Sequence, residues 1–184
     1  MLKTKKLHTY EDYASMPEDK RYELIWGEIL KVPSPDVPHQ ALGFSLAQQV
    51  SDHVKKTDAG SVYVAPLDVV LDRHSTVQPD IIFVSKARAN IVTDKNIQGA
   101  PDLVFEIVSS GSADRDKLVK RKLYEEHGVR EYWLVDREEK QITVYILKGR
   151  AFKVHGVFGE GDTATSLVLP GLRIDVTALF KIRR

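Results

Sequence analysis

The sequence contains no cysteine, which excludes disulfide bonds, thiolate metal ligands and thiol nucleophiles. Long apolar runs are also absent, because none approaches the roughly 20 residues that a membrane-spanning helix needs. The basic stretch from Met1 to Tyr13 lacks the apolar centre of a signal peptide. We therefore expect a cytoplasmic protein that contacts no membrane. Neither positive nor negative charge is in large excess, since the formal net charge is only +1. Binding to nucleic acid would therefore have to use local basic clusters.

The chain has 184 residues, of which 42% are hydrophobic and 29% charged, values typical of one soluble globular domain spanning residues 1–184. Helices are predicted from a cap at Thr9, over residues 39–55, and from Ser112 or Asp114 to His127. Between the first two helices, prolines at positions 33, 35 and 38 predict an extended linker. Period-two apolar patterns predict two short strands within 21–32 around Gly27, and strands at 61–71, 80–84, 103–108, 131–135, 142–147 and 152–158. This order indicates an α/β domain.

The strand over residues 103–108 carries a carboxylate, Glu106, among apolar neighbours on both faces. Such a strand is expected to be central and covered on both sides. A buried unpaired charge is costly, so Glu106 must meet a cation, a set of donors or water in a cleft. A structural ion pair with an arginine or lysine and a metal site are both consistent with this pattern.

Two Pro-Asp pairs offer a second carboxylate, at Asp80 and at Asp102. Asp102 lies four residues from Glu106 on the same strand, so their Cα atoms are roughly 13 Å apart and one ion cannot bind both. Asp80 begins a different strand, and it can converge with Glu106 if the two strands are neighbours. We therefore expect Asp80 to be the partner and Asp102 to be a turn residue.

Lys120 falls in the middle of the packed face of the helix that follows, at 100° per residue. Lysines rarely occupy such a position without a partner. One interpretation is an i,i+4 ion pair with Asp116. The other is that Lys120 points over the sheet toward Glu106 and Asp80. Two acids and a lysine would suit Mg²⁺ and the hydrolysis of a phosphoester by activated water.

The stretches YELIWGEIL, APLDVVL, QPDIIFV, APDLVFEIVS and DRDKLVKRKLYEEHGVREYWLVD resemble the Uma-two restriction endonuclease family of the PD-(D/E)XK nuclease superfamily. The resemblance runs from about Thr9 to Phe180. It implies a restriction-endonuclease-like core at about residues 39–136, with a central mixed β-sheet flanked by helices. An N-terminal helix and hairpin would precede this core, and strands would follow it at the C-terminal end.

The resemblance also implies a site. Asp80 and Glu106 would bind Mg²⁺, with Mn²⁺ as an alternative, and the Ile107 carbonyl would be a third ligand. The superfamily usually places its lysine two residues after the acid, where this chain has Val108. Lys120 from the following helix matches the lysine that takes this place in the family. The catalytic set is then Asp80, Glu106 and Lys120.

The remaining candidates have weaker support. His39, at the start of the first core helix, is an accessory candidate, whereas Glu23 and Asp68 are further acids to which we assign no role. Asp68 is expected to share a strand face with Val64 and Val70. The basic side chains on the helix after Glu106 are candidates for nucleic-acid binding: Arg115, Lys117 and Arg121.

The leading interpretation is a Mg²⁺-dependent endonuclease that cleaves DNA, and we expect a homodimer because duplex DNA has two strands to cut. The alternative is a nuclease-fold protein that binds nucleic acid or a protein partner without turnover, because a fold does not establish an activity. A hydrolase of a small phosphoester is a third interpretation, which a narrow closed pocket would favour.

Overall fold

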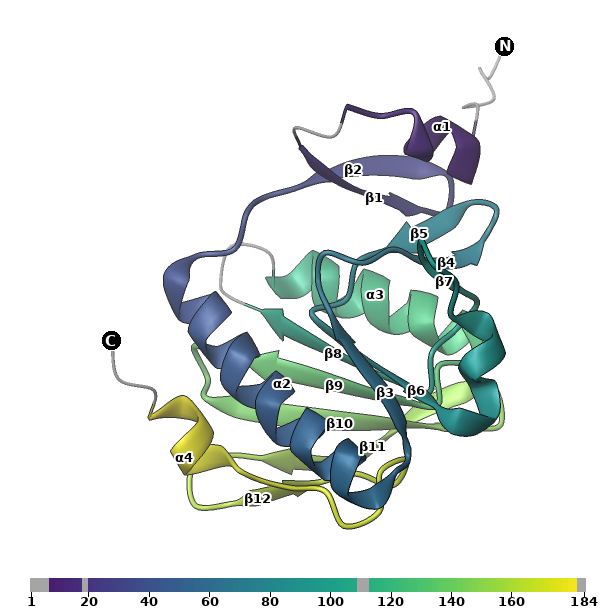
Figure 1. The fold of residues 1–184 in the computed structure, drawn as a ribbon. Helices are drawn as coiled ribbons and strands as arrows, with labels where there is room; N and C mark the ends of the chain where they lie inside the picture. Colours follow the sequence, from purple (N-terminus) through teal and green to yellow (C-terminus); the bar gives the residue numbers. More distant parts are fainter. Residues whose placement is uncertain (1–6, 18–19, 109–112, 182–184) are drawn as a thin grey trace.

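The computed structural model describes residues 7–17, 20–108 and 113–181, without the side chains of 113–116. The strand that carries Glu106 is β8 (Leu103–Val108), and it lies inside a six-stranded sheet (Figure 1). The strand order of the sheet is β11-β10-β9-β8-β6-β3. β8 pairs with β9 in parallel, and every other pairing is antiparallel, so the predicted mixed sheet is confirmed. The other strands are β3 (Gly60–Val64), β6 (Ile81–Ser85), β9 (Glu131–Asp136), β10 (Gln141–Lys148) and β11 (Ala151–Phe158).

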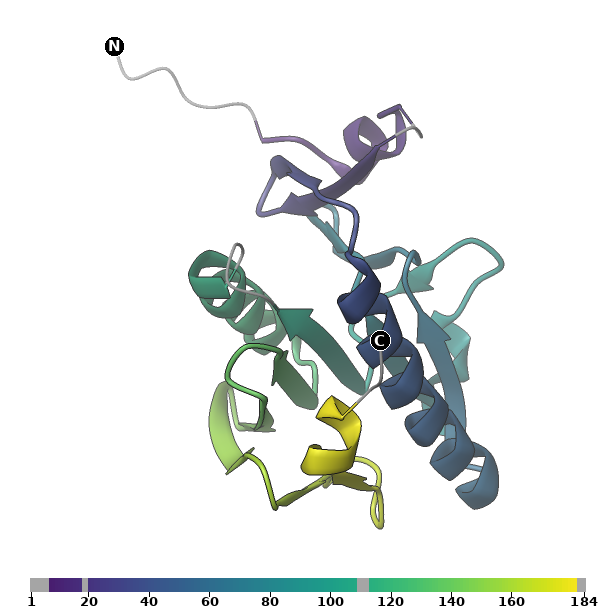
Figure 2. The ribbon, with the colours of Figure 1, turned by 90° about the vertical axis from the view of Figure 1, so that its left-hand side faces the viewer.

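Two helices cover the two faces of this sheet (Figure 2): α2 (Val37–Thr57) and α3 (Ala113–His127). Successive side chains of β8 alternate between the faces, as strand geometry requires. Phe105 and Ile107 pack in the core beneath α2, whereas Val104 and Val108 pack in the core beneath α3. Glu106 shares the parity of Val104 and Val108, so its side chain faces α3. This parity directs the carboxylate toward the helix that carries Lys120.

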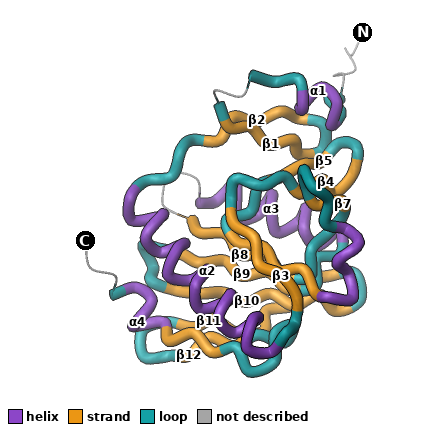
Figure 3. Tube along the Cα trace, viewed as in Figure 1, coloured by secondary structure: helices purple, strands orange, loops and turns teal. Residues whose placement is uncertain are grey.

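A second, five-stranded sheet has the order β2-β1-β5-β4-β7 and packs beside the first (Figures 1 and 3). The predicted hairpin is confirmed as β1 (Arg21–Ile25) and β2 (Glu28–Val32). Trp26 and Gly27 form its two-residue turn, both with positive φ, which is typical of type I′ turns. The other strands of this sheet are β4 (Val69–Asp72), β5 (Ser75–Val77) and β7 (Ile97–Gln98). The helix α1 (Tyr10–Ala14) precedes the hairpin in the chain.

The single strand predicted over residues 61–71 is wrong. The chain leaves the six-stranded sheet at the end of β3 and enters the five-stranded sheet at β4, with the cis bond between Ala65 and Pro66 in the connection. The β-branched residues on either side gave one continuous signal although they belong to two sheets. Asp68 therefore shares no strand face with Val64. Its carboxylate accepts hydrogen bonds from the Tyr13 hydroxyl at 2.7 Å and from Gln78 Nε2 at 2.9 Å.

The helix predicted over 39–55 begins earlier, at Val37, so Pro38 lies in its first turn and not in the extended linker. Proline is tolerated there because the first-turn N–H groups have no helical partner. Asp36 caps this helix by accepting from the His39 N–H at 2.8 Å. The 3₁₀ helix η1 (Lys86–Ile91) occupies part of the irregular stretch predicted after β6.

The strands predicted at 142–147 and 152–158 are β10 and β11, and the C-terminal part adds two strands that the sequence did not place, β12 (Thr163–Thr165) and β13 (Arg173–Asp175), and a short helix, α4 (Val176–Phe180). Ile174, Val176 and Leu179 pack in the core beneath α2. Among the described residues, no helix is both long enough and apolar enough to cross a membrane.

Candidate functional site

Asp80 lies immediately before β6, next to the strand β8 that carries Glu106. In the antiparallel pairing of β6 with β8, Ile81 is opposite Phe105. Asp80 Oδ2 accepts a hydrogen bond of 2.7 Å from the Ile107 N–H. The strand adjacency that the sequence argument required is therefore present, and both carboxylates line one pocket.

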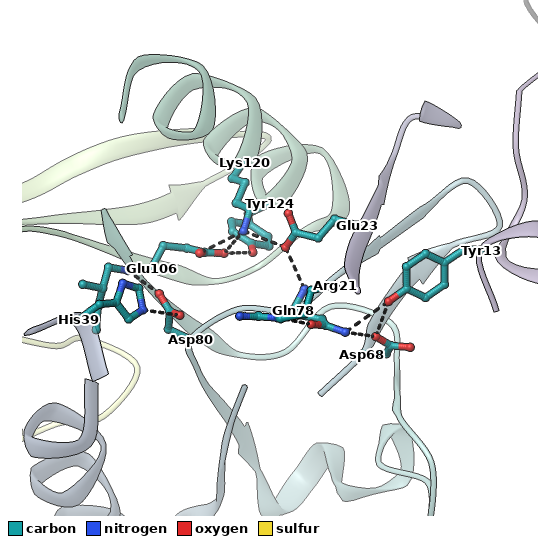
Figure 4. A network of polar contacts seen from close by, with 11 residues as sticks. Tyr13, Arg21, Glu23, His39, Asp68, Gln78, Asp80, Glu106, Lys120 and Tyr124 are labelled. Atoms are coloured by element: carbon teal, nitrogen blue, oxygen red, sulfur yellow. Dashed lines mark hydrogen bonds and ion pairs between the residues drawn. The ribbon is translucent and has the colours of Figure 1, made fainter. Parts of the chain in front are cut away.

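Lys120 reaches Glu106 from α3 (Figure 4). Its Nζ donates to Glu106 Oε1 at 3.0 Å and to Oε2 at 3.1 Å. Only 9% of Lys120 and 6% of Glu106 are exposed, so this is a buried ion pair. Of the two interpretations of Lys120, the structure shows the one that points at Glu106. The side chain of Asp116 lies outside the described residues.

The same lysine also donates to Glu23 Oε1 at 2.9 Å. Glu23 belongs to β1, in the other sheet, and is almost fully buried. Sequence reasoning assigned it no role, although it carries the signal that singled out Glu106: a lone carboxylate beside a buried apolar run, here Leu24 and Ile25. Glu23 also accepts from the Gln78 N–H at 3.0 Å, which fixes it independently of Lys120.

Tyr124 is a second contact with Glu106 that the sequence did not single out. Its ring does pack against Tyr132, with 5.3 Å between the ring centroids. Its hydroxyl, however, donates to Glu106 Oε1 at 2.5 Å. The spacing of four residues between Lys120 and Tyr124, one helical turn, is the signal that could have found it.

His39 lies next to Asp80, and its accessory role stays a prediction. Its Nε2 is 3.0 Å from Asp80 Oδ1, and both side chains are partly exposed in the same pocket. Together with the bond from the Ile107 N–H, this contact fixes both oxygens of Asp80. The capped start of α2 places His39 there.

Burial raises the pKa of Glu106 to about 7, and the negative charges of Asp80 and Glu23 add to this effect against the opposing charge of Lys120. Burial alone would lower the pKa of Lys120, but the charges of Glu106 and Glu23 outweigh it and raise that pKa above its ordinary value. Burial and the Glu106 charge also raise the pKa of Tyr124. The raised pKa of Lys120 keeps it an ammonium, and the raised pKa of Glu106 favours its protonated form relative to an exposed carboxyl group.

The donor set fits a hard cation. Asp80 and Glu106 provide carboxylate oxygens, and the backbone of Ile107 faces the same side, because the N–H and C=O of a strand residue point the same way. Within the described part of the chain, no three or more His, Asp or Glu side chains are grouped to hold a metal ion. Mg²⁺ needs no such group, since it is commonly bound by one or two carboxylates and keeps several waters.

The three predicted nucleic-acid contacts lie outside this pocket or outside the described side chains. Lys117 Nζ donates to Asp136 Oδ2 at 2.6 Å, and the Arg121 guanidinium lies 5.6 Å from the centroid of the Tyr145 ring. The side chain of Arg115 lies outside the described residues. Their role in binding stays a prediction. Arg137, which the sequence did not single out, lines the pocket and pairs with Asp36 at 2.8 Å.

Asp102 lies at the other end of β8 from Glu106, at a bend, as predicted for a turn residue, and its side chain is fully buried. Its carboxylate accepts from the Ser85 N–H at 2.8 Å and from Arg130 Nη1 at 3.0 Å. These partners satisfy Asp102 far from Lys120, and they give it a structural role that is distinct from the site.

Comparisons with known proteins bear on the fold and family of the chain. The family model Uma2, described as "Putative restriction endonuclease", matches residues 7–177. The chain is also similar to a crystal structure described as a putative nuclease belonging to DUF820 from Anabaena variabilis ATCC 29413, with a TM-score of 0.75 and 23% identity, covering 94% of this chain and 97% of that chain. No curated protein matches. The likeness in structure confirms the predicted restriction-endonuclease-like fold.

Proposed function

Because the chain belongs to the Uma2 family of putative restriction endonucleases, we propose that it is a Mg²⁺-dependent nuclease that hydrolyses phosphodiester bonds of DNA. One observation carries the proposal: a lysine from α3 donates to Glu106 at 3.0 Å, in a pocket that Glu106 shares with Asp80. This arrangement contains two carboxylates that can hold a metal ion and an ammonium that can stabilise negative charge on a phosphoryl group.

In this proposal Asp80, Glu106 and the Ile107 carbonyl hold the ion. When bound, Mg²⁺ lowers the pKa of water and neutralises charge on the phosphoryl group. His39 and the Ile107 N–H fix the two oxygens of Asp80, and Tyr124 fixes Oε1 of Glu106. Water attacks phosphorus and forms a new P–O bond while the bond to the departing oxygen breaks; the water loses one proton, and the departing oxygen gains one.

Lys120 has the role of stabilising negative charge as it develops on the phosphoryl oxygens. Its ammonium is preorganised by Glu106 and Glu23, so it needs little reorganisation when charge develops. The raised pKa of Lys120 keeps this group charged throughout the neutral range.

The test is incubation of the purified protein with single-stranded and duplex DNA in the presence of Mg²⁺ or Mn²⁺. Cleavage is expected for the native chain and loss of cleavage for Lys120→Ala and Glu106→Gln. Asp102→Asn is the matched control, because it removes a buried carboxylate from the same strand outside the site and should cut normally. Absence of cleavage on every substrate, together with absence of Mn²⁺ binding by calorimetry, would overturn the proposal.

A second candidate function is nucleic-acid binding without turnover. It is favoured by the hydrogen bonding of the carboxylates, since all four oxygens of Asp80 and Glu106 accept hydrogen bonds from protein groups. A site satisfied in this way needs no ion for its stability. Steeply salt-dependent binding of DNA without cleavage would support this candidate.

Hydrolysis of a small phosphoester, the homodimer and the cytoplasmic location stay predictions of the sequence. Turnover of bis(4-nitrophenyl) phosphate and sedimentation velocity would test the first two.

A further inference from the structure

A second hollow of about 120 Å³ lies between the first half of α2 and the end of β3. Its walls are mostly apolar and include Phe44, Ala47 and Val64, with Gln40 at the side. Phe44 is 74% exposed and Val64 is 52% exposed, although the opposite face of α2 is buried in the core through Leu46. We call this hollow the Phe44 groove.

The Phe44 groove adjoins the reacting pocket, because His39 and Asp80 line both. A ligand that extends from the carboxylates past Asp80 therefore meets Phe44 next. For a nucleic-acid strand whose phosphodiester lies at Asp80, the neighbouring part is a sugar with its base. A base has an aromatic face that stacks on an aromatic side chain. Gln40 adds a side chain that can both donate and accept hydrogen bonds at the edge of that base.

The reacting pocket is a partly open recess. It measures about 220 Å³ and is walled by Arg21 and Glu23 of the hairpin, by the linker at 33–35 and by Arg137. Its central groups, Glu106 and Lys120, are 6% and 9% exposed. A phosphodiester must therefore enter a recess to reach them. The bases of a duplex are stacked inside the helix, so a base could reach Phe44 only after unpairing and unstacking, at a cost of a few kcal/mol, whereas a single strand can turn a base outward at lower cost.

From the recessed carboxylates and the adjoining groove together, we infer that the substrate is single-stranded nucleic acid and that one unpaired base next to the reacting phosphodiester stacks on Phe44. This inference rests on the proposed nuclease function and specifies its substrate class. Stacking contributes about 1–3 kcal/mol per base and is tolerant of sequence, so Phe44 provides affinity without sequence recognition.

The experiment measures binding without a divalent metal, by fluorescence anisotropy of a dye-labelled single-stranded oligonucleotide. Phe44→Ala is expected to weaken the affinity about tenfold, and Phe44→Trp to retain it. The matched control is Leu167→Ala, which truncates an apolar residue that is 54% exposed and lines neither hollow, and it should bind as the native chain does. The paired duplex should bind more weakly and without dependence on Phe44.

A scan of abasic sites along the oligonucleotide locates the stacked base. At one position, removal of the base should lower the affinity of the native chain while leaving that of Phe44→Ala unchanged. Equal binding by Phe44→Ala and the native chain, or preference for the duplex, would overturn the inference. It would also be overturned if sedimentation shows that Phe44→Ala converts a dimer to a monomer, since the groove would then hold a second copy of the chain. Binding that depends on Phe44 but is never followed by cleavage would count against the nuclease proposal alone.

Discussion

Lys120 on α3 and Glu23 on β1 are 97 residues apart in the sequence, yet the ammonium donates to the carboxylate at 2.9 Å. The bond joins the helix that covers the six-stranded sheet to a strand of the other sheet. The N-terminal hairpin is thus a structural part of the candidate site, because one of its side chains holds the lysine from the side opposite to Glu106.

Replacement of Glu23 by Gln should lower kcat at least tenfold, or about 1.4 kcal/mol of barrier, because the amide keeps an oxygen for Lys120 but removes the charge that orients it. The measurement is steady-state cleavage of an oligonucleotide. Asp68→Asn is the control, since Asp68 bonds Tyr13 and Gln78 in the same region but does not contact Lys120 (Figure 4). A loss of equal size in the control would assign Glu23 a role in stability only.

Replacement of Lys120 by Met should lower the free energy of unfolding at pH 8 by about 3 kcal/mol, because it leaves Glu106 and Glu23 buried without their cation. Urea unfolding measures the change. The double variant Lys120→Met with Glu106→Gln should recover part of the lost free energy, since it removes one of the two buried carboxylates that have no cation. If the two changes are instead additive, the ion pair does not account for the burial of Lys120.

The stability of the protein should depend on pH through Glu106. Its pKa in the folded protein, about 7, lies above the ordinary value of 4.5, so folding favours the protonated acid. This contribution is complete below about pH 4.5 and is lost as the pH rises through 7. The melting temperature of Glu106→Gln relative to the native chain should therefore increase between pH 5 and pH 8. A constant difference across that range would show that Glu106 is ionised throughout.

Asp102 should show the opposite dependence. Burial opposes its ionisation, but the bonds from the Ser85 N–H and from Arg130 hold its pKa below the ordinary value of 3.8. Its contribution is present above about pH 4 and is lost as the pH falls through the pKa of the folded state. Asp102→Asn should cost about 2 kcal/mol at pH 7 and progressively less in acid, as measured by urea unfolding. The same cost at pH 3 would exclude this explanation.

The sequence was sufficient for the central part of the site because short-range geometry decides it. The parity of β8 makes Glu106 a buried carboxylate, and the helical period places Lys120 on the packed face of α3. Asp80 was preferred to Asp102 because of the distance along one strand, and the pairing of β6 with β8 brings Asp80 next to the end of β8, where it accepts from the Ile107 N–H. Each step needed only the spacing of residues within one element or between two adjacent strands.

The contacts that sequence reasoning missed join helices and strands that are far apart in the sequence. No local pattern of residues shows how such elements pack together. Glu23 meets Lys120 only because the five-stranded sheet packs against α3. The break between β3 and β4 was missed because the residues on both sides are β-branched, so that two strands gave the signal of one. Tyr124 lies one helical turn after Lys120, but that spacing alone does not show that its hydroxyl, rather than only its ring, reaches Glu106.

The alternation of β8 between the two cores also has a consequence for folding. If β8 paired with its neighbours one residue out of register, its side chains would exchange faces. Glu106 would then enter the apolar core beneath α2, where Leu42, Leu46 and Val50 provide no cation and no hydrogen-bond donor. An uncompensated carboxylate in that core is far more costly than a misplaced valine. The residue proposed to hold the ion therefore also discriminates against misfolded chains, by making the slipped sheet unstable.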